Sequence, residues 1–204
     1  MHIAIAGNIG SGKTTLTGLL SKYYRCEAQY EDVENNPYLE RFYEDMQRWS
    51  FNLQIYFLNN RIIKVIDIRN SGKFVIQDRT IYEDSNIFAA NLHSMGLLST
   101  IDYNNYLSSF ELISSFIQPP DLLLYLKASI PTLVKHIQKR GREYENAIRL
   151  DYLNNLNDRY EEWVSNYNLG KILIIDIDKV NFTDNPEGLG IVINKIDSQI
   201  HGLF

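Results

Sequence analysis

The stretch that decides the fold lies near the N-terminus and reads Gly7-Asn8-Ile9-Gly10-Ser11-Gly12-Lys13-Thr14. It matches the eight-position pattern of a phosphate-binding loop, in which four variable residues separate a glycine from a Gly-Lys-Thr or Gly-Lys-Ser triplet. The apolar run Ile3 to Ala6 precedes it, and a helical pattern from Thr14 to Tyr24 follows. Because the motif requires a strand before it and a helix after it, we predict a phosphate-binding strand, loop and helix unit.

The chemistry of this loop depends on its backbone and on two side chains. Glycines let successive N–H groups point at phosphate oxygens, and the N-terminal end of the next helix adds positive charge. Lys13 is expected to reach the β- and γ-phosphates, and Thr14 to offer its hydroxyl to Mg²⁺. ATP is thus predicted to bind along Gly7, Asn8, Ile9, Gly10, Ser11, Gly12, Lys13, Thr14 and Thr15. A glycine-rich turn that binds nothing is the alternative on the loop alone.

Beyond the loop, short apolar runs alternate with longer stretches of helical period. The runs predict strands over Ile3 to Ala6, Ala28 to Tyr30, Phe74 to Ile76, Leu122 to Leu126 and Ile172 to Ile177. The stretches predict helices over Thr14 to Tyr24, Trp49 to Asn70, Ser85 to Met95, Asp102 to Phe116, Ile130 to Lys139, Arg149 to Val164 and Glu187 to Gln199. Such alternation is typical of an α/β protein, so we predict a five-stranded parallel sheet flanked by helices.

Composition limits the class of protein. The 204 residues, 45% of them hydrophobic and 22% charged, predict one domain over residues 1–204. A net charge of −5 argues against nucleic-acid polymers or anionic membranes as partners. The apolar run Leu122 to Leu126 is far shorter than the roughly 18 residues that a spanning helix needs. The single cysteine, Cys26, excludes a disulfide framework and fits a reducing cytoplasm.

Charged residues follow two of the predicted strands, where an open parallel sheet binds its ligands. Glu31 follows the second strand, and Asp78 and Arg79 follow the third. Phosphoryl transfer to a hydroxyl needs an in-line acceptor, a metal, cations and a carboxylate that takes the proton. Glu31 is therefore a candidate base, Asp78 a candidate ligand of the metal or its waters, and Arg79 a candidate clamp. The sequence leaves open whether the base is Glu31 or one of its neighbours, Asp32 and Glu34.

Three further segments, taken with the loop, resemble the deoxynucleoside kinase family. They are Asp78 to Asp84 (DRTIYED), Phe51 to Tyr56 (FNLQIY) with Arg61 beyond it, and Arg140 to Glu145 (RGREYE). The resemblance implies a P-loop kinase fold with a short arginine-rich lid at about 140–148. It implies phosphorylation of a deoxynucleoside 5′-hydroxyl with ATP and Mg²⁺, catalysed by Lys13, Glu31 and Arg79, and a homodimer built on long helices.

The resemblance also assigns the contacts of each ligand. The deoxynucleoside would bind Glu31, Tyr43, Gln54, Arg61, Arg79, Asp84, Phe88 and Glu145, with Tyr43 and Glu145 on the sugar 3′-hydroxyl. Arg140 and Arg142 would close over the donor phosphates, and Thr14 and Asp78 would hold the metal. Geometry supports one part independently, because Gln54 and Arg61 lie seven residues apart and so share a helix face about 10.5 Å apart along the axis. The base is expected to be a purine, adenine or guanine, with cytosine as a further possibility.

The sequence departs from the family pattern at three positions. Asp78 stands where a glutamate is commoner, Asp32 where many relatives have proline, and His136 where relatives often carry a lid arginine. The shorter Asp78 side chain predicts a water between carboxylate and metal. The departure at His136 predicts one phosphate contact fewer.

Other nucleotide-binding classes account for the chain less well. A nucleoside monophosphate kinase shares the loop and lid but should add arginines for the acceptor phosphate. A regulatory module would bind ATP without transferring phosphate. A GTPase is suggested by Asn194 to Asp197 (NKID), yet Val192, Ile193 and Ile196 recur at helical spacing around it, which predicts a solvated helix face.

Overall fold

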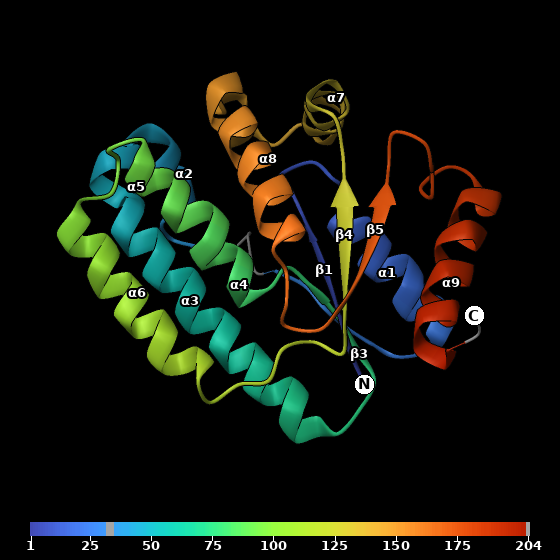
Figure 1. The fold of residues 1–204 in the computed structure, drawn as a ribbon. Helices are drawn as coiled ribbons and strands as arrows, with labels where there is room; N and C mark the ends of the chain where they lie inside the picture. Colours follow the sequence, from blue (N-terminus) through green and yellow to red (C-terminus); the bar gives the residue numbers. More distant parts are fainter. Residues whose placement is uncertain (32–34, 203–204) are drawn as a thin grey trace.

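A five-stranded parallel sheet organises the molecule, with its strands in the order β2-β3-β1-β4-β5 (Figure 1). The strands are β1 (His2–Gly7), β2 (Glu27–Gln29), β3 (Val75–Asp78), β4 (Leu122–Lys127) and β5 (Lys171–Asp176). The structure, a computed structural model, describes residues 1–31 and 35–202. The fold class and all five strands are as predicted, with ends that differ by one or two residues.

The central strand carries the phosphate loop and is buried along its whole length. Ile3 and Ile5 pack into the hydrophobic cluster on one face of the sheet, while Ala4 and Ala6 contact the other face. Strand β1 pairs with β3 on one side and β4 on the other, and its register places Ile5 opposite Asp78. Since all strands run the same way, the end of β3 lies beside the start of the loop.

Helices cover both faces of the sheet. Helices α1 (Lys13–Tyr24) and α9 (Pro186–His201) lie on one side, and α7 (Ile130–Arg140) joins their cluster through Leu133 and Ile137 (Figure 1). The other side holds α3 (Met46–Ser71), α6 (Thr100–Ser114) and α8 (Leu150–Ser165). Gly72, in the left-handed conformation at φ 63°, follows the last residue of the long helix α3, which ends one residue beyond the predicted Asn70 and begins at Met46 instead of Trp49. Within the described residues, none of the helices has the length and apolarity to cross a membrane.

The structure corrects several helical predictions. The helix expected over Ser85 to Met95 consists of α4 (Ile81–Glu83), the π-helix η1 (Asp84–Ala89) and α5 (Ala90–Ser94). It begins earlier because Thr80 forms its N-cap. Two short elements were not predicted, α2 (Leu39–Glu44) and the 3₁₀-helix η2 (Glu143–Ala147), because neither spans enough turns to show a period. Asp78 closes strand β3 instead of following it.

The segment Asn194 to Asp197 lies inside α9, as its helical spacing predicts. Asn194 and Lys195 are exposed, and Ile196 is buried in the core. Asp197 accepts a hydrogen bond from the hydroxyl of Tyr24 at 2.8 Å. The segment therefore fastens α9 to α1 and lies outside the nucleotide-binding region.

Candidate active site

The phosphate loop forms the floor of the site and is closed by its own lysine. Gly10 and Gly12 have φ values of 85° and 89°, a conformation that is unfavourable for residues with a side chain. The two glycines therefore allow the loop to turn tightly before α1. Lys13 Nζ donates to the carbonyl oxygens of Gly7 at 2.8 Å and Asn8 at 3.0 Å. Burial, with nearby Arg79, lowers the pKa of Lys13 to about 7. A bound phosphate would provide an anionic partner for this buried ammonium group and so favour its charged form.

Neighbouring helices hold the loop from behind. A Cβ on Gly10 would lie 2.8 Å from the Leu133 carbonyl oxygen, so only glycine lets α7 approach this closely. His136 of α7 donates from Nδ1 to the Gly10 carbonyl oxygen at 2.8 Å. Asn8 Nδ2 donates to the carbonyl of Leu153 in α8 at 3.1 Å. The family resemblance places His136 at a lid position, and in the structure His136 contacts the phosphate loop through the Gly10 carbonyl.

Asp78 and Thr14 form the candidate metal site. Thr14 Oγ1 donates to Asp78 Oδ2 at 2.5 Å, while Asp78 Oδ1 is buried and has no hydrogen-bond partner among the described residues. Burial raises the pKa of Asp78, although Lys13 opposes that effect. A hydroxyl and a carboxylate with a free oxygen, beside a phosphate loop, are the oxygen donors that Mg²⁺ takes alongside phosphates and water. The residues fit the ion.

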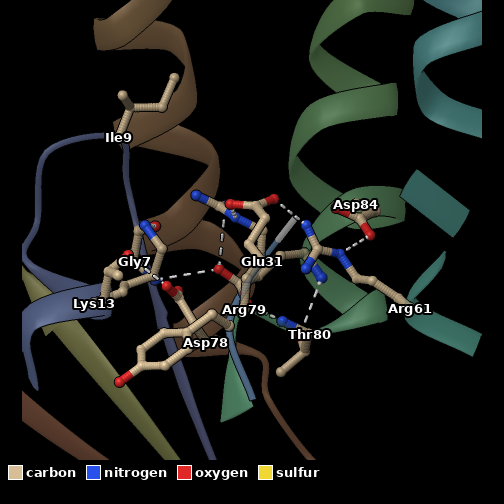
Figure 2. Close-up of polar contacts among 12 residues, drawn as sticks. Gly7, Ile9, Lys13, Glu31, Arg61, Asp78, Arg79, Thr80 and Asp84 are labelled. Atoms are coloured by element: carbon tan, nitrogen blue, oxygen red, sulfur yellow. Dashed lines mark hydrogen bonds and ion pairs between the residues drawn. The ribbon is translucent and has the colours of Figure 1, made fainter. Parts of the chain in front are cut away.

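Glu31 lies between two buried arginines (Figure 2). Arg61 Nη2 contacts Glu31 Oε1, and Arg79 Nε lies 3.4 Å from Glu31 Oε2. Burial alone would raise the pKa of Glu31, but Arg61, Arg79 and Lys13 outweigh it and lower the pKa to about 2. Glu31 is therefore ionised at neutral pH. Asp32 and Glu34, the alternative bases, lie outside the described residues.

The polar side chains predicted to read a base also converge. Arg61 Nε forms an ion pair with Asp84 Oδ2, so one guanidinium joins Asp84 to Glu31 (Figure 2). Gln54 is buried, and its Oε1 has no partner among the described residues. The Phe88 ring lies 4.6 Å from the Arg79 guanidinium carbon. A planar ligand with both donors and acceptors would satisfy the Gln54 amide.

Arg140 and Arg142, the arginines of the predicted lid, both form ion pairs with Glu145. Arg140 forms two hydrogen bonds with Glu145, at 2.6 and 3.0 Å, and Arg142 Nη1 lies 3.5 Å from the same carboxylate. The rings of Tyr43 and Tyr144 stack with centroids 5.6 Å apart. Burial raises the pKa of Tyr43 well above its usual value, so its hydroxyl stays protonated.

Most of the predicted site residues line one pocket, whose empty volume including the open mouth is about 870 Å³. Its lining includes loop residues Ile9, Gly10, Lys13 and Thr14 together with Glu31, Tyr43, Gln54, Arg79, Asp84, Phe88, Arg140, Arg142 and Glu145. Arg61 and Asp78 are not in the lining and contact it through Glu31, Asp84 and Thr14. The predicted loop residues Gly7, Asn8, Ser11 and Gly12 are also outside the lining. Thr15 is exposed and does not line the pocket.

Sequence reasoning missed several residues of the site. Glu83 and Tyr160 both contact Arg79, and the pocket wall also includes Leu39, Phe42, Leu53, Phe57, Tyr144 and Tyr152. The one signal available for Glu83 was its spacing from Thr80, since Thr-x-x-Glu before a helix forms a capping box. Tyr160 is 81 positions from Arg79, and no local pattern points to it.

Comparisons with known proteins give a consistent result. The model of the family described as deoxynucleoside kinase matches residues 3–201. A deoxyadenosine/deoxycytidine kinase of Bacillus subtilis is 38% identical over 98% of this chain and 93% of its own. A deoxyadenosine kinase of Dictyostelium discoideum is 41% identical over 94% and 77%. The solved deoxyadenosine kinase of M. mycoides with bound dATP superposes with a TM-score of 0.86 at 32% identity, covering 97% of this chain and all of that one.

Proposed function

Because this chain belongs to the deoxynucleoside kinase family, we propose that it transfers the γ-phosphoryl group of ATP to the 5′-hydroxyl of a deoxynucleoside, with Glu31 accepting the hydroxyl proton. The observation that carries this proposal is the convergence of Lys13, Glu31 and Arg79 on one pocket. The described chain would act as one catalytic domain, with its lid at about 140–148. Its single cysteine fits a reducing cytoplasm.

The donor side is formed by the phosphate loop and the lid. The loop amides and Lys13 would bind the β- and γ-phosphates, and Arg140 and Arg142 would exchange Glu145 for phosphate oxygens. Thr14 and Asp78 would hold Mg²⁺, which when bound neutralises charge that develops on the phosphates. Because the transition state is loose, the protein contributes mainly position and positive charge.

The acceptor side is formed by Glu31 and Arg79. Glu31 is ionised in the free enzyme and can accept a hydrogen bond from the 5′-hydroxyl as soon as the substrate binds. Its low pKa makes it a weak base in the ground state. It would take up the proton late, when the oxygen is already bonding to phosphorus and its acidity has risen. Arg79 would hold the Glu31 carboxylate in place through their ion pair and stabilise the negative charge of the transferred phosphoryl group.

For the base we propose adenine first, followed by cytosine and then guanine. Asp84 is a hydrogen-bond acceptor held by Arg61, and an exocyclic amino group is its natural partner. Adenine and cytosine carry such a group, whereas guanine presents the acceptor O6 there. The B. subtilis relative, named for deoxyadenosine and deoxycytidine, supports this order. A role in purine deoxynucleoside salvage follows from that substrate.

The quaternary state proposed is a homodimer. Helices α3 and α6 lie side by side (Figure 1). The exposed large apolar residues include Ile63 and Ile66 of α3, Ile101 and Leu112 of α6, and Phe116 just beyond α6. Several large apolar side chains exposed on two adjacent helices favour a protein interface over a solvated surface. Sedimentation equilibrium of the wild type and of the Ile63→Glu/Leu112→Glu variant tests this. A dimer converted to a monomer is expected, and a monomeric wild type contradicts the proposal.

A rate panel tests the function directly. Initial rates are measured with each of the four deoxynucleosides and with dAMP as acceptor, using ATP or GTP as donor. We expect the fastest transfer from ATP to deoxyadenosine. Faster transfer to dAMP would identify a nucleoside monophosphate kinase instead. ATP binding without any transfer would identify a regulatory module.

A further inference from the structure

Glu83 is a fully buried carboxylate that joins four parts of the site. Its side chain is 0% exposed. Oε2 accepts from the backbone N–H of Thr80 at 2.7 Å, and Oε1 accepts from Gly7 N at 3.2 Å and from the Tyr160 hydroxyl at 2.8 Å. Arg79 Nη1 lies 3.4 Å from the same Oε1. A buried charge is costly unless it is paired and hydrogen-bonded, and this one is both.

The Tyr160 hydroxyl completes a closed triangle with Glu83 and Arg79. It accepts a hydrogen bond from Arg79 Nη1 at 2.8 Å and donates one to Glu83 Oε1 at 2.8 Å. Both roles of one hydroxyl are thereby used, so its orientation is determined. Arg79 is held from one side by this pair and from the other by Glu31. Its Nη2 hydrogen-bonds to no described residue and is available to a ligand.

The backbone of Arg79 shows why such support is needed. Its φ is 67°, in the left-handed region that residues with a side chain disfavour. Such a conformation persists only where the surroundings impose it. The backbone N–H of Arg79 donates to the Ile5 carbonyl at 3.0 Å, and Thr80 begins the capping box with Glu83. The backbone thus leaves the strand at Arg79, and the Arg79 side chain points toward Glu31.

We propose that Glu83 and Tyr160 are positioning residues of the transfer reaction, which act through Arg79 by fixing its guanidinium relative to Glu31 and the phosphate loop. The bond from Gly7 N to Glu83 makes the first residue of the loop part of the same framework. A shift of the loop would therefore move Arg79 with it. The inference rests on the proposed phosphoryl transfer and adds to it the residues that align its arginine.

Tyr160→Phe is the most direct test, because it removes one hydroxyl and keeps the buried ring. Tyr125→Phe is a matched control, since the Tyr125 ring stacks on that of Tyr160 with centroids 5.8 Å apart but its hydroxyl bonds to Glu161. We expect kcat of Tyr160→Phe to fall by roughly 10- to 100-fold, the usual effect of losing a hydrogen bond to a charged group. The KM for ATP and the melting temperature should match those of the control.

A double-mutant cycle separates positioning from general damage. In an Arg79→Lys background, which lacks the Nη1 donor, Tyr160→Phe should lower kcat little further if it acts through Arg79. Losses that multiply would overturn the proposal, and so would equal kcat values for Tyr160→Phe and Tyr125→Phe. A second cycle combines Glu83→Gln with Arg79→Lys, and here too the loss of kcat in the double variant should be smaller than the product of the two single losses. The wild-type rate is the reference: its absence would count against the kinase function, whereas its presence with uncoupled variants would count against positioning alone.

Discussion

Arg61 holds the carboxylate of Glu31 in an ion pair, although the two residues lie 30 positions apart in the sequence. The same guanidinium contacts Asp84, so the candidate base for proton transfer and the candidate reader of the nucleobase share one cation. A substrate that binds Asp84 would therefore alter the surroundings of Glu31. If Asp84 reads the base and Glu31 takes the proton, recognition of the base and activation of the 5′-hydroxyl would be linked through the Arg61 side chain.

Glu31→Gln should abolish most turnover while leaving ATP binding intact. The amide cannot accept a proton, and losing a general base costs roughly 10² to 10⁴ in rate. The measurement is kcat in a coupled assay, together with ATP affinity from calorimetry. Unchanged turnover would transfer the role to Asp32 or Glu34.

Asp78→Asn should raise the Mg²⁺ concentration needed for half-maximal activity by roughly 10- to 100-fold, as for the loss of a group that orients a metal site. The reason is that Asp78 Oδ1 is the buried carboxylate oxygen without a partner beside Thr14. A titration of rate against Mg²⁺ measures the effect. Thr14→Ser, which keeps the hydroxyl, serves as the control and should shift the curve little. An unshifted curve for Asp78→Asn would remove Asp78 from the metal site.

Stability should fall below neutral pH because of His2. Burial lowers the pKa of His2 to about 4 from its ordinary 6.5, although its hydrogen bond with Gln77 opposes the shift. The unfolded chain then binds more protons between these values, so stability is complete above pH 6.5 and is lost as the pH falls toward 4. Urea denaturation should show a loss of up to about 2 kcal/mol at pH 5 from this group.

His2→Gln should remove that part of the pH dependence, whereas the exposed His201→Gln should leave it in place. If both variants keep the wild-type slope between pH 5 and 6.5, burial of His2 does not couple folding to protonation.

Gly188→Ala and Gly190→Ala should have opposite effects on stability. A Cβ on Gly188 would lie 1.9 Å from the Asn181 carbonyl oxygen, so the backbone must move, at a cost of about 1–3 kcal/mol. Gly190 lies in the same helix with nothing within 4 Å of its Cβ position, and alanine there should stabilise by about 0.5–1 kcal/mol. Thermal denaturation of the two variants is the check, and equal shifts would contradict it.

The parts of the molecule that sequence could predict are those specified by local pattern. The phosphate loop, the strands and α3 follow from motif and periodicity, and Gln54 and Arg61 share the buried face that their spacing predicts. The triangle of Arg79, Glu83 and Tyr160 could not be found in this way, because it depends on α8 packing against the end of β3. The π-helix at Asp84–Ala89 was also not predicted, because its i→i+5 hydrogen bonds space side chains differently from the 3.6-residue period of an α-helix.

The central position of β1 has a consequence for how the protein is made. Its partners β3 and β4 follow tens of residues later in the chain, and Asn8 is held by Leu153, 145 positions away. A nascent chain on the ribosome therefore carries the glycine-rich segment long before the segments that shape it exist. Since such distant contacts form late, the capacity to bind a nucleotide should emerge only after synthesis has passed α8, so nucleotide binding by the nascent chain would report that α8 has packed against the loop.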